Sequence, residues 1–339
     1  MKLIKTVDAV GHVLCHDMTQ IIPGQYKDAR FRKGHKVTEE DIPVLLSMGK
    51  EHLYVWEMTP GMLHENEGAE RLRRICQNEG MTASAVKEGK IELTADHDGL
   101  FLVDVDRLDA INSLDEVMIA TRKGGTAVKK GDKLCGTRVI PLVVDGRKLD
   151  EADKIAGDTP ILQLLPWKLH KVGVITTGSE VYKGLIEDKF TPVIVNKMKQ
   201  YGIEMTEHVL VDDGMEHLVD AIAEMRTKDV DMILCTGGMS VDPDDNTPGA
   251  IKRSGANIVS YGAPVLPGAM FLLGYYDDGM PVMGLPGCVM YAAATVFDLV
   301  LPKVAAGRKV TKQELVHYGN GGLCLGCKPC HYPDCPFGK

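Results

Sequence analysis

Short apolar runs alternate with amphipathic stretches along the second half of the chain. The runs at 171–176, 203–211 and 231–236 have the length of strands, and the last of them has the apolar content of a buried one. Leu218 and Ile222 lie at helical spacing between the second and third runs, which predicts an amphipathic helix. Strands and helices that alternate at this length predict an α/β fold with a doubly wound, mainly parallel sheet and helices on both faces.

Turn and capping residues predict the remaining elements of this half. Proline suits the first turn of a helix, glycine its end, and an Asp-Asp-Gly sequence a hairpin turn. The expected elements are a helix from Pro192 to Gly202, a helix from Thr247 to Gly255, a hairpin that turns at Asp277–Gly279, and a helix from Cys288 to Ala306.

The first half has shorter elements and predicts smaller β-rich and α+β regions. Thr38 and Asp41 indicate a helix start, Leu45 and Leu46 lie on its apolar face, and Gly49 ends it. Further elements are expected at 67–79 (helix) and at 91–94, 100–105 and 139–144 (strands), with a polar boundary near 146–160. We therefore expect an N-terminal β-rich and helical region at 1–57, a small α+β linker domain at 58–165, an α/β domain at 166–310 and a cysteine-rich tail at 311–339.

Composition is that of a water-soluble globular chain, with 44% hydrophobic and 25% charged residues. The net charge of −8 gives no electrostatic reason to expect nucleic acid or an anionic membrane as a partner. The first residues lack the apolar core of a signal peptide, and the apolar stretch 288–301 contains Asp298, so it reads as a core helix. A cytoplasmic location is expected.

Four loops follow the carboxyl ends of the predicted strands, where open parallel sheets bind their ligands. Acids in these loops favour a cation, whereas their glycines and the helix starts behind them favour close contact with an anion. A phosphorylated ligand that a divalent cation bridges to the carboxylates would satisfy both the preference for a cation and the preference for an anion. The loops lie at 177–180, 212–214, 237–245 and 285–287.

Five motifs in this half occur together in one known family: TTGSEV, VDDG, TGGMSVDPDDNTP, LPGAM and GLPG, with Asn196 in the first helix. Through them residues 171–306 resemble the molybdopterin-binding domain of the enzymes that complete the molybdenum cofactor. Upstream, AVGHVLCHD, FRKGH and GTRVIPLV resemble the N-terminal regions of the molybdopterin molybdenumtransferases. The resemblance implies a homodimer that binds adenylylated molybdopterin, in which molybdate replaces the nucleotide in the presence of magnesium.

By position, the resemblance implies catalytic roles for Glu180, Asp245 and Asp212, with Asp245 holding magnesium or orienting the ligand. Asp242 stands where the family usually has glycine, and with Asp244 it suits capping of the following helix. The ligand-binding residues implied are Thr177, Gly178, Ser179, Asn196, Asp213, Gly237, Gly238, Ser240, Asp242, Pro267, Gly268, Pro286 and Gly287.

Two departures weaken the case for metal insertion relative to pterin binding. Leu266 and Ala269 flank Pro267-Gly268, where many family members have lysines suited to phosphate or molybdate. The family's C-terminal β domain is expected to be replaced here by the cysteine-rich tail.

Four cysteines crowd the tail, at Cys324, Cys327, Cys330 and Cys335. In a reducing compartment such crowding predicts a metal centre instead of disulfides. The spacing resembles the ferredoxin run with one extra residue before the last cysteine, which favours a [4Fe–4S] cluster. Zinc also accepts four thiolates, and a metal-free tail that relays sulfur or metal stays open as a third alternative.

Three functions fit these features. The first is a molybdenumtransferase-like enzyme that inserts molybdate into adenylylated molybdopterin. The second is a non-catalytic carrier or maturation factor that delivers molybdopterin to a client molybdoenzyme. The third is an iron–sulfur redox or sensor protein.

Overall fold

A computed structural model describes residues 2–23, 26–55 and 60–339. The chain forms two compact units. The first unit contains Met1–Asp96, Val103–Gly124 and Lys130–Gln163, and the second contains His97–Leu102, Gly125–Lys129 and Leu164–Lys339. Strands β8 (Gly99–Val103), β10 (Thr126–Val128) and β13 (Leu162–Pro166) form a three-stranded sheet in the order β10-β8-β13.

The second unit is built on a six-stranded sheet in the order β15-β14-β16-β19-β18-β17. The first four strands are parallel, and β18 and β17 add an antiparallel edge. The predicted α/β fold with a mainly parallel sheet is thus confirmed. The strands are β14 (Lys171–Thr177), β15 (Glu204–Val211), β16 (Met232–Thr236), β17 (Asn257–Tyr261), β18 (Leu272–Tyr275) and β19 (Pro281–Leu285).

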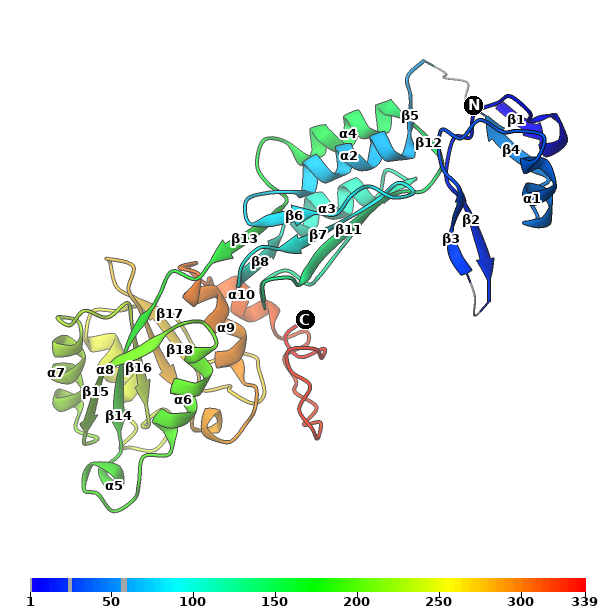
Figure 1. Cartoon of the computed structure of the whole chain (residues 1–339). Coiled ribbons are helices and arrows are strands. Elements are labelled where there is room, and N and C mark those ends of the chain that lie inside the picture. The colour runs from blue at the N-terminus through cyan, green and yellow to red at the C-terminus, as the bar shows by residue number, and fades with distance from the viewer. Residues whose placement is uncertain (1, 24–25, 56–59) are drawn as a thin grey trace. The chain divides into compact units, whose positions relative to one another are not determined.

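Helices cover both faces of this sheet, as Figure 1 shows. Alternate residues of the central strands point to opposite faces, so Val174 packs in one core and Ile175 in the other. The first core is completed by α6 (Phe190–Lys199) and α9 (Val296–Ala305), the second by α7 (Met215–Met225) and α8 (Thr247–Arg253). The unit also contains α5 (Ser179–Tyr182), η2 (Gly287–Met290) and α10 (Lys312–His317).

One prediction for this unit is wrong in detail, and one strand was not predicted. The helix expected from Cys288 is a short 3-10 turn, and α9 begins only after Thr295, whose hydroxyl and Asp298 form a reciprocal capping box. Strand β17 was not predicted, because only Ile258 and Val259 mark it as apolar.

The first unit contains several short sheets. Its main sheet has the order β6-β7-β11-β9, and the pairs β1-β4, β2-β3 and β5-β12 are antiparallel. The strands of the first half are β1 (Lys2–Lys5), β2 (Met18–Ile22), β3 (Tyr26–Phe31), β4 (His52–Val55), β5 (Met62–His64), β6 (Met81–Ala83), β7 (Lys90–Ala95), β8 (Gly99–Val103), β9 (Val117–Thr121), β10 (Thr126–Val128), β11 (Lys133–Val139), β12 (Val143–Asp145) and β13 (Leu162–Pro166). The helices of this half are η1 (Thr6–Asp8), α1 (Asp41–Ser47), α2 (Glu65–Cys76), α3 (Val105–Asn112) and α4 (Gly146–Ala156).

Three expectations for the first unit need correction. The polar segment near 146–160 contains helix α4, which buries Leu149 and two alanines, and small side chains give a weak apolar signal. The run 139–144 contains the ends of two strands, because residues 140–142 turn between β11 and β12. Helix α1 begins at Asp41, whose carboxylate accepts hydrogen bonds from Thr38 instead of being capped by it.

None of the described helices combines the length and the apolar character needed to cross a bilayer.

Candidate ligand site at the carboxyl edge of the sheet

The four predicted loops meet at one edge of the sheet of the second unit. Strand β14 is hydrogen-bonded to both β15 and β16, and β16 is bonded to β19. Because these strands are parallel, their carboxyl ends and the loops that follow lie side by side. The helices behind three of the loops are short: α5 has four residues, α8 seven and η2 four. Their contribution to anion binding through the helix dipole is therefore smaller than expected, and loop N–H groups become the available donors.

Asp213 joins the first loop to the second. Its carboxylate accepts a hydrogen bond of 2.7 Å from the Thr177 hydroxyl and one of 2.8 Å from the Ser179 N–H. Both bonds go to an ionised acceptor, which makes them stronger than neutral ones. Asp213 was predicted to bind ligand, and the structure gives both of its carboxylate oxygens a partner within the protein. These two hydrogen bonds tie the loop at 177–180 to the second loop.

Gly237 and Gly238 bring the third loop against the first. Gly237 has φ +85°, and a Cβ there would lie 2.2 Å from the carbonyl oxygen of Thr177, so only glycine fits. The Thr247 hydroxyl donates to the Gly237 carbonyl at 2.9 Å, and the Asn246 amide donates to the Asp213 carbonyl at 2.8 Å. The loops after β14, β15 and β16 are thereby tied to one another.

Asp212 faces a separate hollow beside the edge strand β15. Its carboxylate accepts hydrogen bonds from the Gly214 N–H at 2.9 Å and from His217 Nδ1 at 2.7 Å. The hydrogen bond from His217 lowers the pKa of Asp212, and the same contact raises the pKa of His217. The hollow has a volume of about 500 Å³ and is also lined by Tyr182 and His208. The Asp212 carboxylate is therefore already hydrogen-bonded to His217.

Asp245 shapes the tip of the third loop. Its Oδ2 accepts the Asp242 N–H at 3.0 Å, which closes a turn across the acidic stretch. Tyr261, at the end of β17, donates to the Met239 carbonyl at 3.0 Å. Burial and the negative charge of Asp245 raise the pKa of Tyr261. Sequence reasoning missed Tyr261, because the strand that carries it has little apolar signal. Ser240 and Asp242 are exposed on this loop.

The other predicted residues differ in their exposure and in their contacts. Glu180 is exposed on α5, and its carboxylate makes no hydrogen bond to another described residue. Gly287 is also exposed, and a Cβ built there would have no atom within 4 Å. Gly268 is enclosed, because a Cβ there would lie 2.6 Å from Val296. Asn196 is exposed on α6, and no hydrogen bond within the described ranges links it to the loops.

A polar cluster behind the first loop was not predicted. The Thr176 hydroxyl lies 3.1 Å from the Thr191 hydroxyl and 3.0 Å from His208 Nε2. Asp188 accepts the N–H groups of Phe190 and Thr191 at 2.8 and 3.0 Å. Burial opposes ionisation of Asp188, but these hydrogen bonds outweigh it and its pKa is lowered. The cluster holds the segment between α5 and α6 against the sheet. Its only signals in the sequence were Thr176 at the end of an apolar strand and His208 in a strand of mixed polarity.

The described acids of these loops do not form a complete set of metal ligands by themselves. Among the residues that the structure describes, no three His, Cys, Asp or Glu side chains are grouped so that they could hold an ion, the tail cysteines included. Magnesium commonly uses one or two carboxylates and completes its shell with phosphate oxygens and water. Glu180, with both carboxylate oxygens, and Asp245, with Oδ1, fit that mode, because these oxygens accept no hydrogen bond from a described residue.

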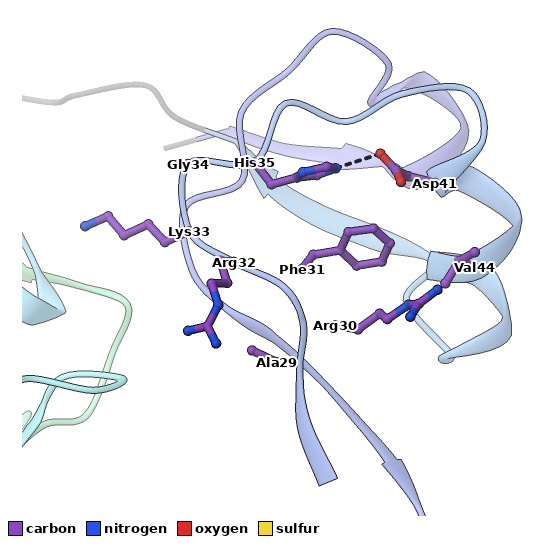
Figure 2. Close-up of a pocket in the computed structure, with 9 residues that line it drawn as sticks. All are labelled: Ala29, Arg30, Phe31, Arg32, Lys33, Gly34, His35, Asp41 and Val44. Carbon is purple, nitrogen blue, oxygen red and sulfur yellow. Dashed lines mark hydrogen bonds and ion pairs between the residues drawn. The ribbon is translucent and has the colours of Figure 1, made fainter. Parts of the chain in front are cut away.

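A second hollow, of about 690 Å³, lies in the first unit between β3 and α1. Figure 2 shows Arg30 reaching toward Val44, while Arg32 and Lys33 extend to the other side of the chain. The ion pair between His35 and Asp41 measures 2.7 Å. Positive charge here favours anions, but the three long basic side chains do not converge on one point. We refer to this region, residues 29–44, as the basic hollow.

Comparisons with known proteins relate both halves of the chain to sequence families. Residues 173–306 match the family described as "Probable molybdopterin binding domain", and residues 3–57 match a domain of unknown function, DUF8806. A molybdopterin molybdenumtransferase of Synechococcus elongatus is 24% identical over 186 residues, which are 52% of this chain and 46% of that protein. A CinA-like protein of Shewanella frigidimarina is 38% identical over 84 residues, 25% of this chain and 20% of that protein.

The chain thus spans about half or less of the length of these curated relatives. Among solved structures, the tungsten cofactor synthesizing protein MoaB of Pyrococcus furiosus is 24% identical. That match covers 40% of this chain and 93% of MoaB, with a TM-score of 0.34.

Proposed function

Because residues 173–306 of this chain belong to the molybdopterin-binding domain family, we propose that the protein binds adenylylated molybdopterin and inserts molybdate into it. The ligand would lie across the loops at 177–180, 237–245 and 285–287. One observation carries this placement. The loops are tied together by Asp213 and Asn246, while Glu180 and Gly287 are left open at the same edge.

Each part of the edge has a role in this proposal. Backbone N–H groups at 237–238 would donate to a phosphate, and the absence of side chains lets this segment pack against Thr177 and Thr247. Glu180 and Asp245 each have a carboxylate oxygen that accepts no hydrogen bond from a described residue, so they would hold magnesium together with the ligand's phosphates. Bound magnesium would neutralise charge on the phosphate that is released with AMP. Asp213 and Asp212 would act indirectly, by positioning the first and second loops.

A non-catalytic carrier is the second candidate, and a specific observation favours it. Leu266 and Ala269 flank the Pro267-Gly268 segment, so the cations useful for molybdate are missing from that loop. A carrier would bind molybdopterin and hand it to a client molybdoenzyme, as a homodimer if the family resemblance extends to assembly. Molybdate-dependent release of AMP from adenylylated molybdopterin separates the two functions, because only the enzyme accelerates it.

Gly287→Ala is the sharpest test of where the ligand lies. The added methyl group meets no atom within 4 Å, so folding should be unchanged, whereas a ligand phosphate against this backbone would be displaced. We expect pterin affinity, measured by fluorescence titration, to fall about tenfold or more, which is about 1.4 kcal/mol. The double substitution Arg30→Gln and Arg32→Gln in the basic hollow serves as control and should leave the affinity unchanged.

Two further substitutions separate binding from chemistry. Glu180→Gln and Asp245→Asn preserve volume and remove charge, so they should slow AMP release while the unfolding temperature stays unchanged. Unchanged AMP release in both variants would refute the role of these acids. If pterin binding survives Gly287→Ala and is lost in the basic-hollow variant, the site has been placed in the wrong unit.

A further inference from the structure

Residues 322–338 form a loop that is fastened at its base to the second unit. The Leu266 N–H donates to the Gly322 carbonyl at 2.8 Å, and the Cys324 N–H donates to the Leu266 carbonyl at 2.8 Å. At the other end, the Gly338 N–H donates to the Gly321 carbonyl at 2.9 Å. The two ends of the loop therefore meet, and Gly321 and Gly322 take part in these bonds.

Two aromatic residues fix the downstream side of the loop. Phe337 is 3% exposed and packs in the core that contains α6 and α9. The Tyr332 hydroxyl donates to the Asp298 carbonyl at 2.9 Å, and its ring meets Phe337 edge-on at 6.1 Å. The tail is thus docked on the α/β unit instead of extending from it.

The four tail cysteines divide into two pairs on this loop. Cys324 and Cys335 are half-buried and pack against the same core, whereas Cys327 and Cys330 are exposed. All four are free thiols. The base of the loop thus carries two thiols in fixed positions, and the exposed part between them carries the other two.

We propose that this loop binds one metal centre through the thiolates of Cys324, Cys327, Cys330 and Cys335. Binding would close the loop, since residues 325–334 must fold the exposed pair onto the fixed pair before four ligands surround the metal. Each thiol loses its proton to solvent as its sulfur bonds to the metal, so affinity should rise with pH. The shared chemistry is a four-thiolate site, which suits either one zinc ion or a [4Fe–4S] cluster.

The fastened base makes such a centre favourable. Bringing the ends of a flexible segment together costs conformational entropy, and here hydrogen bonds and the burial of Phe337 already hold the two ends together, so only the exposed pair must still move. The chain has few competing sites for a thiophilic metal, because Cys15, Cys76, Cys135 and Cys235 are buried singly or as a pair within the cores. This inference stands without the proposed pterin function.

The position of the loop adds a consequence that does rest on the proposed function. Leu266, to which Cys324 is hydrogen-bonded, directly precedes the Pro267-Gly268 segment assigned to the ligand site. A metal centre at the base of the loop would therefore border that segment.

The test uses the full chain purified without oxygen, in two arms. In the first arm, Co²⁺ is titrated into metal-free protein, and we expect one ion per chain with the absorption bands of a tetrahedral thiolate site. In the second arm, iron and sulfide are measured in the protein as isolated; about four of each per chain identifies the cluster. One equivalent of zinc as isolated identifies zinc instead, and either result supports a four-thiolate centre.

Cysteine variants decide whether the four thiols act together. Cys327→Ser and Cys330→Ser change exposed residues, so they should fold normally while Co²⁺ affinity falls by more than the roughly 10–100-fold typical of losing an outer-shell partner. Cys288→Ser, a half-buried cysteine outside the loop, is the matched control and should bind as wild type. Iodoacetamide labelling read by mass spectrometry should show Cys327 and Cys330 protected only when metal is bound.

Three results would overturn the inference. They are the absence of bound metal in both arms, Co²⁺ binding that survives Cys327→Ser and Cys330→Ser unchanged, or labelling of the exposed pair that metal does not affect. None of these readouts depends on pterin binding or AMP release, so failure of this inference and failure of the proposed function are distinguishable.

Discussion

Replacing Asp213 by asparagine tests how the ligand loops are held together. The carboxylate accepts one hydrogen bond from the Thr177 hydroxyl and one from the Ser179 N–H. Hydrogen bonds to a charged group contribute about 1.5–3 kcal/mol each. Asparagine keeps one neutral acceptor for the Ser179 N–H, worth about 1 kcal/mol, and replaces the charged acceptor at the Thr177 hydroxyl by an NH₂ group. Because the site is half-exposed, we expect a net loss of about 2 kcal/mol.

Calorimetry and urea unfolding of the full chain measure this loss. A change of 2 kcal/mol should lower the unfolding temperature of the second unit by about 4–8 °C. Pterin affinity should fall as well, because the loop at 177–180 loses its link to the second loop. Asp242→Asn is the matched control: that side chain makes no hydrogen bond to another described residue, so its effect should stay within about 0.5 kcal/mol. Equal stabilities of the two variants would refute the positioning role of Asp213.

Three more predictions follow from particular contacts. Gly237→Ala should cost about 3 kcal/mol or more in unfolding free energy, since the strain at φ +85° adds to a clash with the Thr177 carbonyl; a near-neutral effect would contradict the loop geometry. Lys197→Met should cost about 3 kcal/mol, because the buried Asp298 partner at 2.6 Å loses its cation; Lys199→Met, an exposed neighbour, should cost almost nothing. NMR titration should give His217 a pKa above 6.5 that falls in Asp212→Asn, and no change in that variant would dismiss the ion pair.

The pH dependence of this last pair has a defined sign. The folded-state pKa of His217 is raised, so its contribution to stability is present at pH values below 6.5 and is lost as pH rises through the raised value. The pKa of Asp212 is lowered from 3.8, so its contribution is present above 3.8 and is lost as pH falls through the lowered value. The pair therefore stabilises the second loop in mildly acidic solution and releases it in alkaline solution.

The sequence predicted the edge at which the loops gather, because strand order and direction in a parallel sheet follow from alternating strands and helices. It did not predict which acids have both carboxylate oxygens hydrogen-bonded within the protein. Asp213 and Asp245 look alike as loop acids, but Asp213 finds its partners in the first loop, 34 and 36 positions away in the chain. Only the fold brings such groups together, and the same is true of His208 and Asp188 behind that loop.

A capping residue and small side chains explain why the sequence misplaced the start of one helix and missed another. Thr295 forms a capping box with Asp298 and so begins α9 later than the apolar run indicated. The alanines of α4 bury a helix face that hydrophobicity alone does not reveal.

A crystal structure of the full chain soaked with adenylylated molybdopterin would locate the ligand directly. We expect the nucleotide phosphates to lie against the backbone at 237–238 and 287, with Glu180 and Asp245 facing them. Ligand density in the basic hollow at 29–44, with none at these loops, would contradict this placement.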